Sequence, residues 1–136
     1  MNYWLIKSEP STYSIDDLIK EKTTAWTGIR NYAARLHLRA MKKGDTCLFY
    51  HSGDESAVVG IAKVAKESYS DATAIDGDWT AVDVTALKKL KSPVTLKQIK
   101  AEKFLADMPL VKISRLSVSP VTEAQYKKVL EMSAEV

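Results

Sequence analysis

The sequence predicts an α+β protein built on a mainly antiparallel sheet, either open or curled into a barrel. Segments with the two-residue alternation of strands are interspersed with segments that carry helix-capping signals. These segments do not follow the regular strand–helix–strand order that builds a parallel sheet. The length of 136 residues and the hydrophobic content of 46% suit one compact core, so we expect a single domain over residues 1–136.

The N-terminal segment combines a short strand with a helix. Tyr3 to Ile6 is an aromatic and aliphatic run, and Pro10 prevents it from continuing as a central strand. Ser14 begins a helix that runs to about Lys20, because an acidic residue three places later completes a capping box. Glu21 to Thr24 is then a polar exit from this helix.

A second helix is predicted from Tyr32 to about Met41, capped by Asn31 and ended by the turn at residues 43–45. Most positions around this helix are apolar, so we expect it to be largely buried. One narrow arc is polar and mostly basic, and it holds Asn31, Arg35, Arg39 and Lys42. The arc is either the solvated edge of a buried helix, which is the commoner case, or a set of phosphate contacts.

The middle of the chain changes to the period of strands. Thr46 to His51 and Ala57 to Glu67 are rich in β-branched, aromatic and small apolar residues, and a polar turn joins them as antiparallel neighbours. Trp79 to Leu90 alternates and supplies another strand, after a surface loop over residues 69–78. Cys47 lies in the first of these strands and is expected to be a core residue rather than a nucleophile.

The C-terminal third is expected to contain two helices with strands between them. Pro93 should break the preceding strand, and Thr95 then caps a short helix through Lys100. Val111 to Val118 supplies one or two late strands. Residues 122–130 combine a capping box with apolar side chains at helical spacing, so the chain closes on an amphipathic helix.

Composition narrows the possible functions. Twenty Lys and Arg against 17 Asp and Glu give a formal charge of +3, which permits an anionic partner without requiring one. One cysteine forms no internal disulfide or thiolate metal cluster, and the sequence has no metal motif, Gly-rich phosphate loop or nucleophile elbow. The N-terminal apolar run is too short for a signal peptide or a membrane span. We therefore expect a soluble, cytoplasmic protein with no metal, cofactor or membrane partner.

Residues suited to holding a flat, polar ligand are concentrated in the stretch AWTGIRNYAAR, residues 25–35. Trp26 is either a core side chain or a surface on which a base stacks, an interaction worth ~1–3 kcal/mol. Gly28 lets a ligand approach the backbone closely. Asn31 and the first amides of its helix lie at the positive end of the helix dipole, which suits a phosphate or a base carbonyl.

Other polar and aromatic residues leave alternatives open. Tyr50 and His51 supply a second wall or a polar edge to such a site, whereas Trp79 is equally at home in the core. The Lys7-Ser8-Glu9 string holds an amine, a hydroxyl and a carboxylate, which keeps an enzyme acting on a nucleotide or modified base as an alternative. Three consecutive residues of a strand do not point one way, so a non-enzyme is favoured.

Five strings occur in order along nearly the whole chain: YWLIKSEP, YSIDDL, WTGIRNYAAR, MKKGDTCLFYHS and SRLSVSPV. Together they make the sequence similar to the EVE domain family. The resemblance implies a PUA-like fold, a small mixed barrel flanked by helices and related to the YTH domains. It also implies a non-catalytic role, in which one modified base of DNA or RNA, such as 5-methylcytosine or 5-hydroxymethylcytosine, is held in an aromatic-walled pocket.

Carried over residue by residue, the resemblance implies a pocket lined by Lys7, Ser8, Trp26, Gly28, Ile29, Arg30, Asn31, Tyr32, Tyr50, His51 and Ser52. Phosphate contacts are predicted at Arg35, Arg39, Lys42 and Arg115, and the rim at Leu116 and Ser117. Thr27 stands where the family usually has an Asp, which removes a carboxylate from beside the pocket. The sequence does not decide between DNA and RNA, fix the oligomeric state, or rule out a protein-interaction module.

Overall fold

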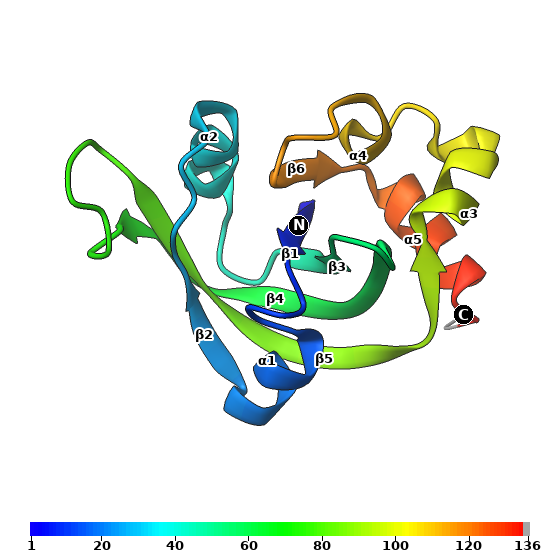
Figure 1. Ribbon diagram of the computed structural model, residues 1–136, viewed down its shortest axis with the longest axis horizontal. Coiled ribbons are helices and arrows are strands. Elements are labelled where there is room, and N and C mark those ends of the chain that lie inside the picture. Colours follow the sequence, from blue (N-terminus) through cyan, green and yellow to red (C-terminus); the bar gives the residue numbers. More distant parts are fainter. Residues whose placement is uncertain (135–136) are drawn as a thin grey trace.

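The computed structural model describes residues 1–134 and contains a six-stranded sheet (Figure 1). The strands are β1 (Tyr3–Ser8), β2 (Thr23–Trp26), β3 (Thr46–His51), β4 (Ala57–Ser70), β5 (Thr80–Thr95) and β6 (Val118–Val121). Their order across the sheet is β2-β5-β4-β3-β1-β6, and neighbours are antiparallel except β1 and β3, which run parallel. The predicted α+β class with a mainly antiparallel sheet is confirmed.

The expected barrel is wrong, because the sheet stays open. Its edges are the four-residue strands β2 and β6, which pair with β5 and β1 and not with each other. The long strands β4 and β5 curve between them, with repeated register shifts that bend the sheet (Figure 1). Helix α2 (Tyr32–Ala40) packs against both β5 and β6, so a helix spans the opening that a closed barrel would fill with paired strands.

Side-chain caps set the helix boundaries, as predicted. Capping boxes at Ser14, Thr95 and Thr122 begin α1 (Ile15–Glu21), α3 (Leu96–Ala101) and α5 (Glu123–Met132). Asn31 begins α2, because its Oδ1 accepts the N–H of Ala34 at 3.0 Å. These signals are local, so the sequence alone reveals them.

The prediction of strands over Val111 to Val118 is wrong. Short helical turns at η1 (Lys103–Leu105) and α4 (Pro109–Lys112) precede the late strand, which is β6. Pro109 occupies the first turn of α4, where its fixed φ angle suits a helix and its missing N–H has no partner to lose.

Two predictions about strand ends are also wrong. Pro93 does not break β5, because it lies in a stretch that skips pairing between the Gly60–Lys89 and Val58–Val94 pairs. Its missing N–H therefore costs no hydrogen bond of the ladder. The supposed polar exit from α1 instead turns directly into β2, whose four residues pair with Val82 to Thr85.

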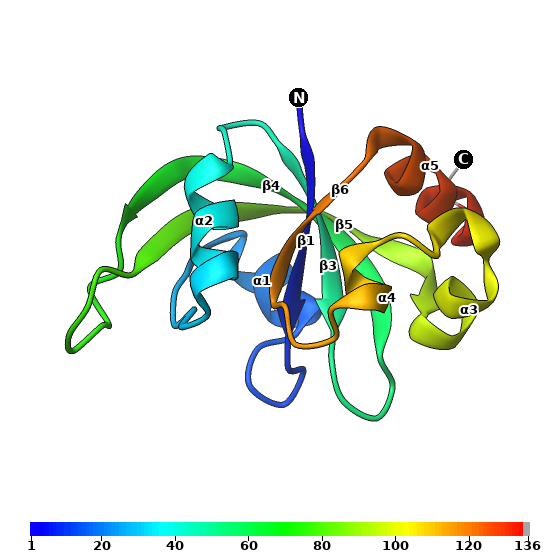
Figure 2. The same cartoon turned by 90° about the horizontal axis from the view of Figure 1, so that it is seen from above.

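Each face of the sheet carries one apolar cluster, and successive side chains of β3 point alternately into the two clusters. Cys47 and Phe49 belong to one cluster, which we call the Trp26 cluster and which α1 and α2 cover. Tyr50 belongs to the other, the Tyr50 cluster, which contains side chains from α3, α4 and α5. Figure 2 shows α2 at one end of the molecule and α3, α4 and α5 gathered at the other. Cys47 is fully buried, as predicted.

Helix α2 is less buried than expected. Ala34 and Leu38 face the Trp26 cluster, whereas Tyr32 and Leu36 are 68% and 59% exposed. The helix lies on the sheet with one face, so the opposite apolar residues remain in solvent. None of the helices in residues 1–134 is long and apolar enough to cross a membrane.

Candidate functional site

Four rings form a row along the face of the sheet that carries the Trp26 cluster. Tyr13, Trp26, Phe49 and His51 follow one another with centroid separations of 6.2, 5.5 and 5.7 Å, each pair edge to face. Trp26 is 7% exposed, and Tyr13 and His51 at the two ends are half-buried. Trp26 therefore packs as part of the core, and the segment that follows it is exposed except for half-buried Ile29, which packs against the same cluster.

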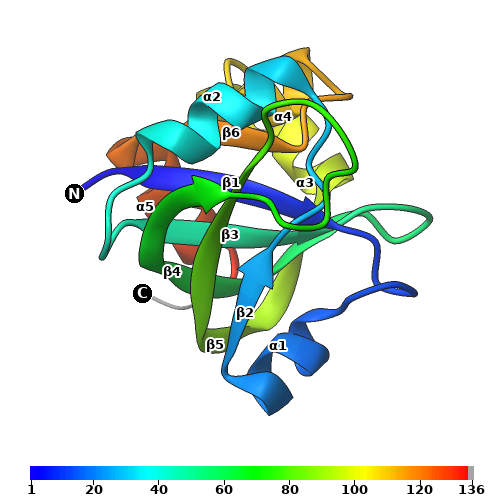
Figure 3. The same ribbon diagram turned by 90° about the vertical axis from the view of Figure 1, so that its left-hand side faces the viewer.

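That exposed segment, residues 27–31, is tied to the β4–β5 loop by one carboxylate. Asp71, whose side chain is fully buried, accepts the N–H of Gly28 at 2.9 Å and Nη1 of Arg30 at 3.0 Å. Gly28 has a φ of +81°, a conformation that other residues adopt only at a cost. Figure 3 shows the β4–β5 loop, in green, beside α2 and the blue segment before it.

Asp71 also organises its own loop, since it accepts the N–H and the Oγ1 hydroxyl of Thr73 at 2.8 and 2.6 Å. Burial acts to raise the pKa of Asp71. The hydrogen bonds from Thr73, Gly28 and Arg30 outweigh that effect and hold the pKa well below its usual range. Sequence reasoning missed Asp71, because it treated residues 69–78 as a surface loop.

An aromatic stack lies next to this carboxylate at the surface. The rings of Tyr32 and Trp79 are 5.2 Å apart at an angle of 26°. Cζ of Arg35 lies 4.9 Å from the Tyr32 ring centroid, and Cζ of Arg30 lies 5.7 Å from that of Trp79. Two predicted pocket residues, Arg30 and Tyr32, thus contact Trp79. The sequence alone did not decide whether Trp79 belongs to the core or to the site.

Two of the predicted phosphate contacts hold the same loop. Arg35 donates from Nη1 to the carbonyl of Asp78 at 2.8 Å. Arg39 pairs with the Asp78 carboxylate at 2.8 Å and donates from Nε to Oγ1 of Thr80, also at 2.8 Å. Both arginines remain partly exposed, and Lys42 and Arg115 are exposed.

Two predicted pocket residues lie on the opposite face from Trp26. Lys7 donates from Nζ to the carbonyl of Ser114 at 2.8 Å, and its Nζ lies 5.8 Å from the Tyr50 ring centroid. Tyr50 itself is 3% exposed within the Tyr50 cluster. Tyr50 therefore does not form a second wall facing Trp26. The alternation of side chains along β3 already indicated in the sequence that Tyr50 lies on the other face of the sheet.

The rest of the predicted pocket set is spread along β1 and the rim. Ser8 donates its hydroxyl to the carbonyl of Tyr13, and the carbonyl of Ser8 accepts the N–H of Ser52 at 2.9 Å. Leu116 is buried in the Trp26 cluster, whereas Ser117 is half-buried and accepts the N–H of Lys7 at 3.0 Å through its carbonyl.

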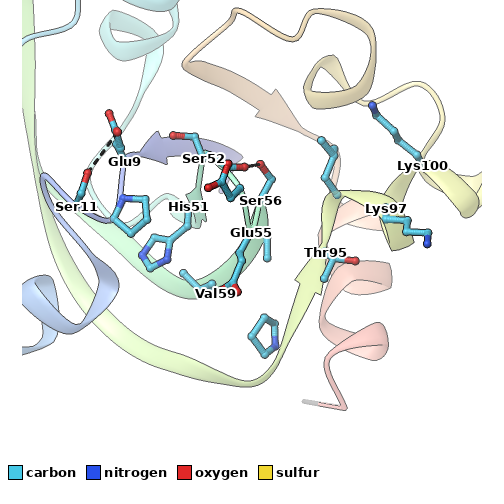
Figure 4. A pocket seen from close by; sticks show the side chains of 16 residues that line it. Glu9, Ser11, His51, Ser52, Glu55, Ser56, Val59, Thr95, Lys97 and Lys100 are labelled. Carbon is cyan, nitrogen blue, oxygen red and sulfur yellow. Dashed lines mark hydrogen bonds between the residues drawn. The ribbon is translucent and has the colours of Figure 1, made fainter.

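His51 and Ser52 line a separate open cleft of ≈ 1270 Å³ (Figure 4). The Glu9 and Ser11 side chains lie on one side of this cleft, and Lys97 and Lys100 of α3 lie on the other. Nε2 of His51 accepts the N–H of Ile15 at 3.0 Å, and burial lowers the pKa of the ring. A neutral His51 therefore fastens the start of α1 to the end of β3.

Within residues 1–134, His, Cys, Asp and Glu side chains form no group of three that could hold a metal ion. The Lys7-Ser8-Glu9 string has three separate sets of partners: Lys7 binds the carbonyl of Ser114, Ser8 that of Tyr13, and Glu9 the hydroxyl of Ser11. No nucleophile and base of this string are bonded to each other in the described contacts.

The EVE domain family model matches residues 2–132. The chain belongs to the EVE domain family. Thymocyte nuclear protein 1 of Gallus gallus is 35% identical to this EVE domain over 167 residues, covering 98% of this chain and 69% of the relative. This relative is named as a nuclear protein, and the cytoplasmic location expected from the sequence stays a prediction.

Two solved structures have a fold similar to that of this EVE domain. The human THYN1 protein in complex with 5-methylcytosine-containing DNA is 33% identical, covers 98% of both chains and superposes with a TM-score of 0.91. The YTH domain of the Zygosaccharomyces rouxii MRB1 protein is 17% identical and covers 97% of this chain and 86% of its own, with a TM-score of 0.62. The fold relation to YTH domains, which the sequence resemblance implied, is confirmed.

Proposed function

We propose that this EVE domain is a nucleic-acid-binding reader that holds one modified base, with 5-methylcytosine in DNA as the leading ligand. One observation carries the proposal. The human THYN1 protein, which matches this chain across its whole fold, is described in complex with 5-methylcytosine-containing DNA. RNA that carries a modified base is the second partner class to be tested.

The base site that we propose lies around residues 27–32, beside Trp26 and Trp79. The exposed segment presents the guanidinium of Arg30, the amide of Asn31 and the Tyr32 ring within one short stretch. Asp71 fixes the backbone of this segment through Gly28, which is the preorganisation that a specific site needs. Ser8 and His51 lie on the same face as Trp26, but their side chains are hydrogen-bonded to Tyr13 and Ile15, so we do not assign them to the base edge.

Binding at this site requires that the free energy gained from the protein exceed the cost of removing the base from its stack. Extruding a base costs a few kcal/mol, and stacking on an aromatic side chain returns about 1–3 kcal/mol. Hydrogen bonds from Arg30 and Asn31 to the base edge supply the remainder. The methyl group adds apolar contact, which discriminates by about 1–3 kcal/mol.

The first test measures binding by the anisotropy of labelled oligonucleotides that differ only in one central cytosine or 5-methylcytosine. We expect the methylated strand to bind at least roughly tenfold more tightly, in single-stranded and in duplex form. Equal affinity for methylated and unmethylated strands would refute the proposed ligand. The same series with 5-hydroxymethylcytosine and N6-methyladenine, in DNA and RNA, compares the other modified bases.

Two variants locate the site in the same assay. Asn31→Ser keeps an oxygen that caps α2 and removes the amide, so the melting temperature should hold while the affinity falls. Trp26→Phe keeps a ring in the core, and we expect weaker binding from it because the smaller ring supports residues 27–31 less closely. Trp4→Phe is the matched control, because Trp4 bonds to Asp45 and lies outside the proposed site. Unchanged affinity in Asn31→Ser and Trp26→Phe would place the base elsewhere.

A second prediction concerns the arginines of α2. The double variant Arg35→Gln and Arg39→Gln should weaken binding equally for all sequences and reduce the slope of log K against log salt by roughly two. The control is Asp78→Asn, which removes the ion pair to Arg39 and leaves both arginines in place. An unchanged slope, or the same change in Asp78→Asn, would show that the arginines hold the loop rather than phosphates.

We infer that the domain acts by binding and not by catalysis. The separate partners of Lys7, Ser8 and Glu9 support this inference, since activation of a nucleophile requires a base in hydrogen-bond reach. Mass spectrometry of methylated nucleosides and oligonucleotides incubated with the domain, with and without divalent metal, checks it. Any protein-dependent product would overturn it.

A further inference from the structure

The β4–β5 loop carries the most exposed large apolar side chain of residues 1–134. Ile75 is fully exposed (102%), above Met1 at 82% and Tyr32 at 68%. The loop extends beyond the body of the sheet, at the end of the molecule where α2 lies (Figures 1 and 2). Ile75 therefore contributes nothing to the apolar clusters that stabilise the fold.

Both ends of this loop are braced. At its start, Asp71 is bound by Gly28 and Arg30, and at its end the Asp78 carbonyl and carboxylate are bound by Arg35 and Arg39. Gly77, near the end of the loop, lies against the Trp79 ring, since a Cβ at this position would be 2.7 Å from its Nε1. The tip is thus presented from a fixed base.

The surroundings of the loop suit a nucleic acid. Arg30, Arg35 and Arg39 place three partly exposed guanidinium groups along its base, of which Arg30 pairs with Asp71 and Arg39 with Asp78. Tyr32 and Trp79 add a stacked aromatic pair beside them. Positive charge next to aromatic surface matches phosphates next to bases, and the same elements border the proposed base site.

We propose that Ile75 is a wedge that enters a duplex and fills the gap left by the base drawn into the site. This inference rests on the proposed function. A base that leaves a duplex opens a space in the stack. Apolar side chains such as Ile, Leu and Met insert between base steps in proteins that bind the minor groove, and the same apolar contact would fill such a space. A single strand has no such gap, so Ile75 acts on duplexes alone.

The test compares Ile75→Ser with the unaltered domain on a 5-methylcytosine duplex and on the same methylated single strand. We expect duplex affinity to fall by roughly tenfold while single-strand affinity and melting temperature are unchanged. A 2-aminopurine next to the methylated cytosine should brighten when the unaltered domain binds the duplex, and brighten less with Ile75→Ser. Equal effects on duplex and single strand, or no effect on either, would overturn the wedge.

Phe104→Ser is the matched control. Phe104 is 55% exposed and belongs to η1, directly after α3 in the chain. Helix α3 lies at the opposite end of the molecule from the loop (Figure 1). This variant should bind both substrates like the unaltered domain. The assay distinguishes failure of the two hypotheses. If the unaltered domain does not prefer methylated single strands, the proposed function is wrong. If it prefers them but Ile75→Ser leaves duplex affinity unchanged, only the wedge is wrong.

Discussion

Replacing Asp45 by alanine is expected to lower the free energy of unfolding by about 3–5 kcal/mol, the largest effect of any substitution considered in this protein. Asp45 is 3% exposed and follows the turn that ends α2. Its Oδ1 accepts the N–H of Asn2 at 3.1 Å. Its Oδ2 accepts Nε1 of Trp4 and the N–H of Lys42, both at 2.9 Å.

The loss is large because the Trp4 donor stays buried after the acceptor is gone. Trp4 is 5% exposed, so its indole N–H has no route to water once the carboxylate is removed. Burial acts to raise the pKa of Asp45, but the hydrogen bonds from Trp4, Lys42 and Asn2 outweigh it and lower the pKa. The ionised carboxylate thus ties β1 to the start of β3.

Urea unfolding followed by circular dichroism measures this effect. Asp45→Asn is the informative companion, because it keeps the shape and replaces one accepting oxygen with a donor that faces other donors. We expect it to recover less than half of the loss. Asp54→Ala, at an exposed acid of the β3–β4 turn, is the control and should leave stability unchanged. A loss below about 1 kcal/mol in Asp45→Ala would contradict the structure at this point.

Replacing Asp71 by asparagine is expected to cost about 2–3 kcal/mol of stability at pH 7 and to weaken binding of methylated DNA. The amide keeps one accepting oxygen in place of two, so it cannot accept all the bonds that Gly28, Arg30 and Thr73 now donate. Both the segment before α2 and the β4–β5 loop then lose their common anchor. Binding should therefore fall in single strands as well as duplexes, unlike the loss expected from Ile75→Ser.

The lowered pKa of Asp71 also predicts in which direction its contribution to stability changes with pH. The pKa of Asp71 is lowered in the folded protein, so below the ordinary Asp value near 3.8 the unfolded chain binds a proton that the folded protein does not. The stabilising contribution of Asp71 is complete above that value and is lost as the pH falls toward the folded pKa. The stability difference between the unaltered protein and Asp71→Asn should accordingly shrink as the pH falls below about 4.

Unfolding curves at a series of pH values, together with anisotropy titrations at pH 7, check both parts. Asp76→Asn is the control, because Asp76 is an exposed acid in the same loop. A stability difference that stays constant from pH 7 to pH 3 would assign the role of Asp71 to packing rather than to its charge.

Local signals explain which parts of the fold could be predicted. Ser14, Asn31, Thr95 and Thr122 begin helices because a cap needs only residues within one turn. Closure of the sheet depends on whether β2 and β6 meet, and no short-range pattern encodes that pairing. Pro93 was misjudged for the same reason, because its cost depends on whether a partner strand requires its N–H.

The candidate site divides in the same way. The cluster at residues 28–32 could be seen in the sequence, since its members adjoin one another. The contact between Gly28 and Asp71 joins positions 43 residues apart, and nothing near either residue indicates it. The position of Tyr50, by contrast, could have been predicted. Side chains alternate along a strand, so Tyr50 lies on the other face of the sheet from its neighbour Phe49.

The two clusters on opposite faces of the sheet have a consequence for how this domain can change over evolution. The Trp26 cluster supports the segments around Gly28 and α2, whereas the Tyr50 cluster is built with α3, α4 and α5 at the other end of the molecule. Distant sites contribute nearly additively to stability. Substitutions in the C-terminal helices can therefore tune the robustness of the domain to heat and turnover while its ligand preference evolves independently through residues 27–32 and 71–79.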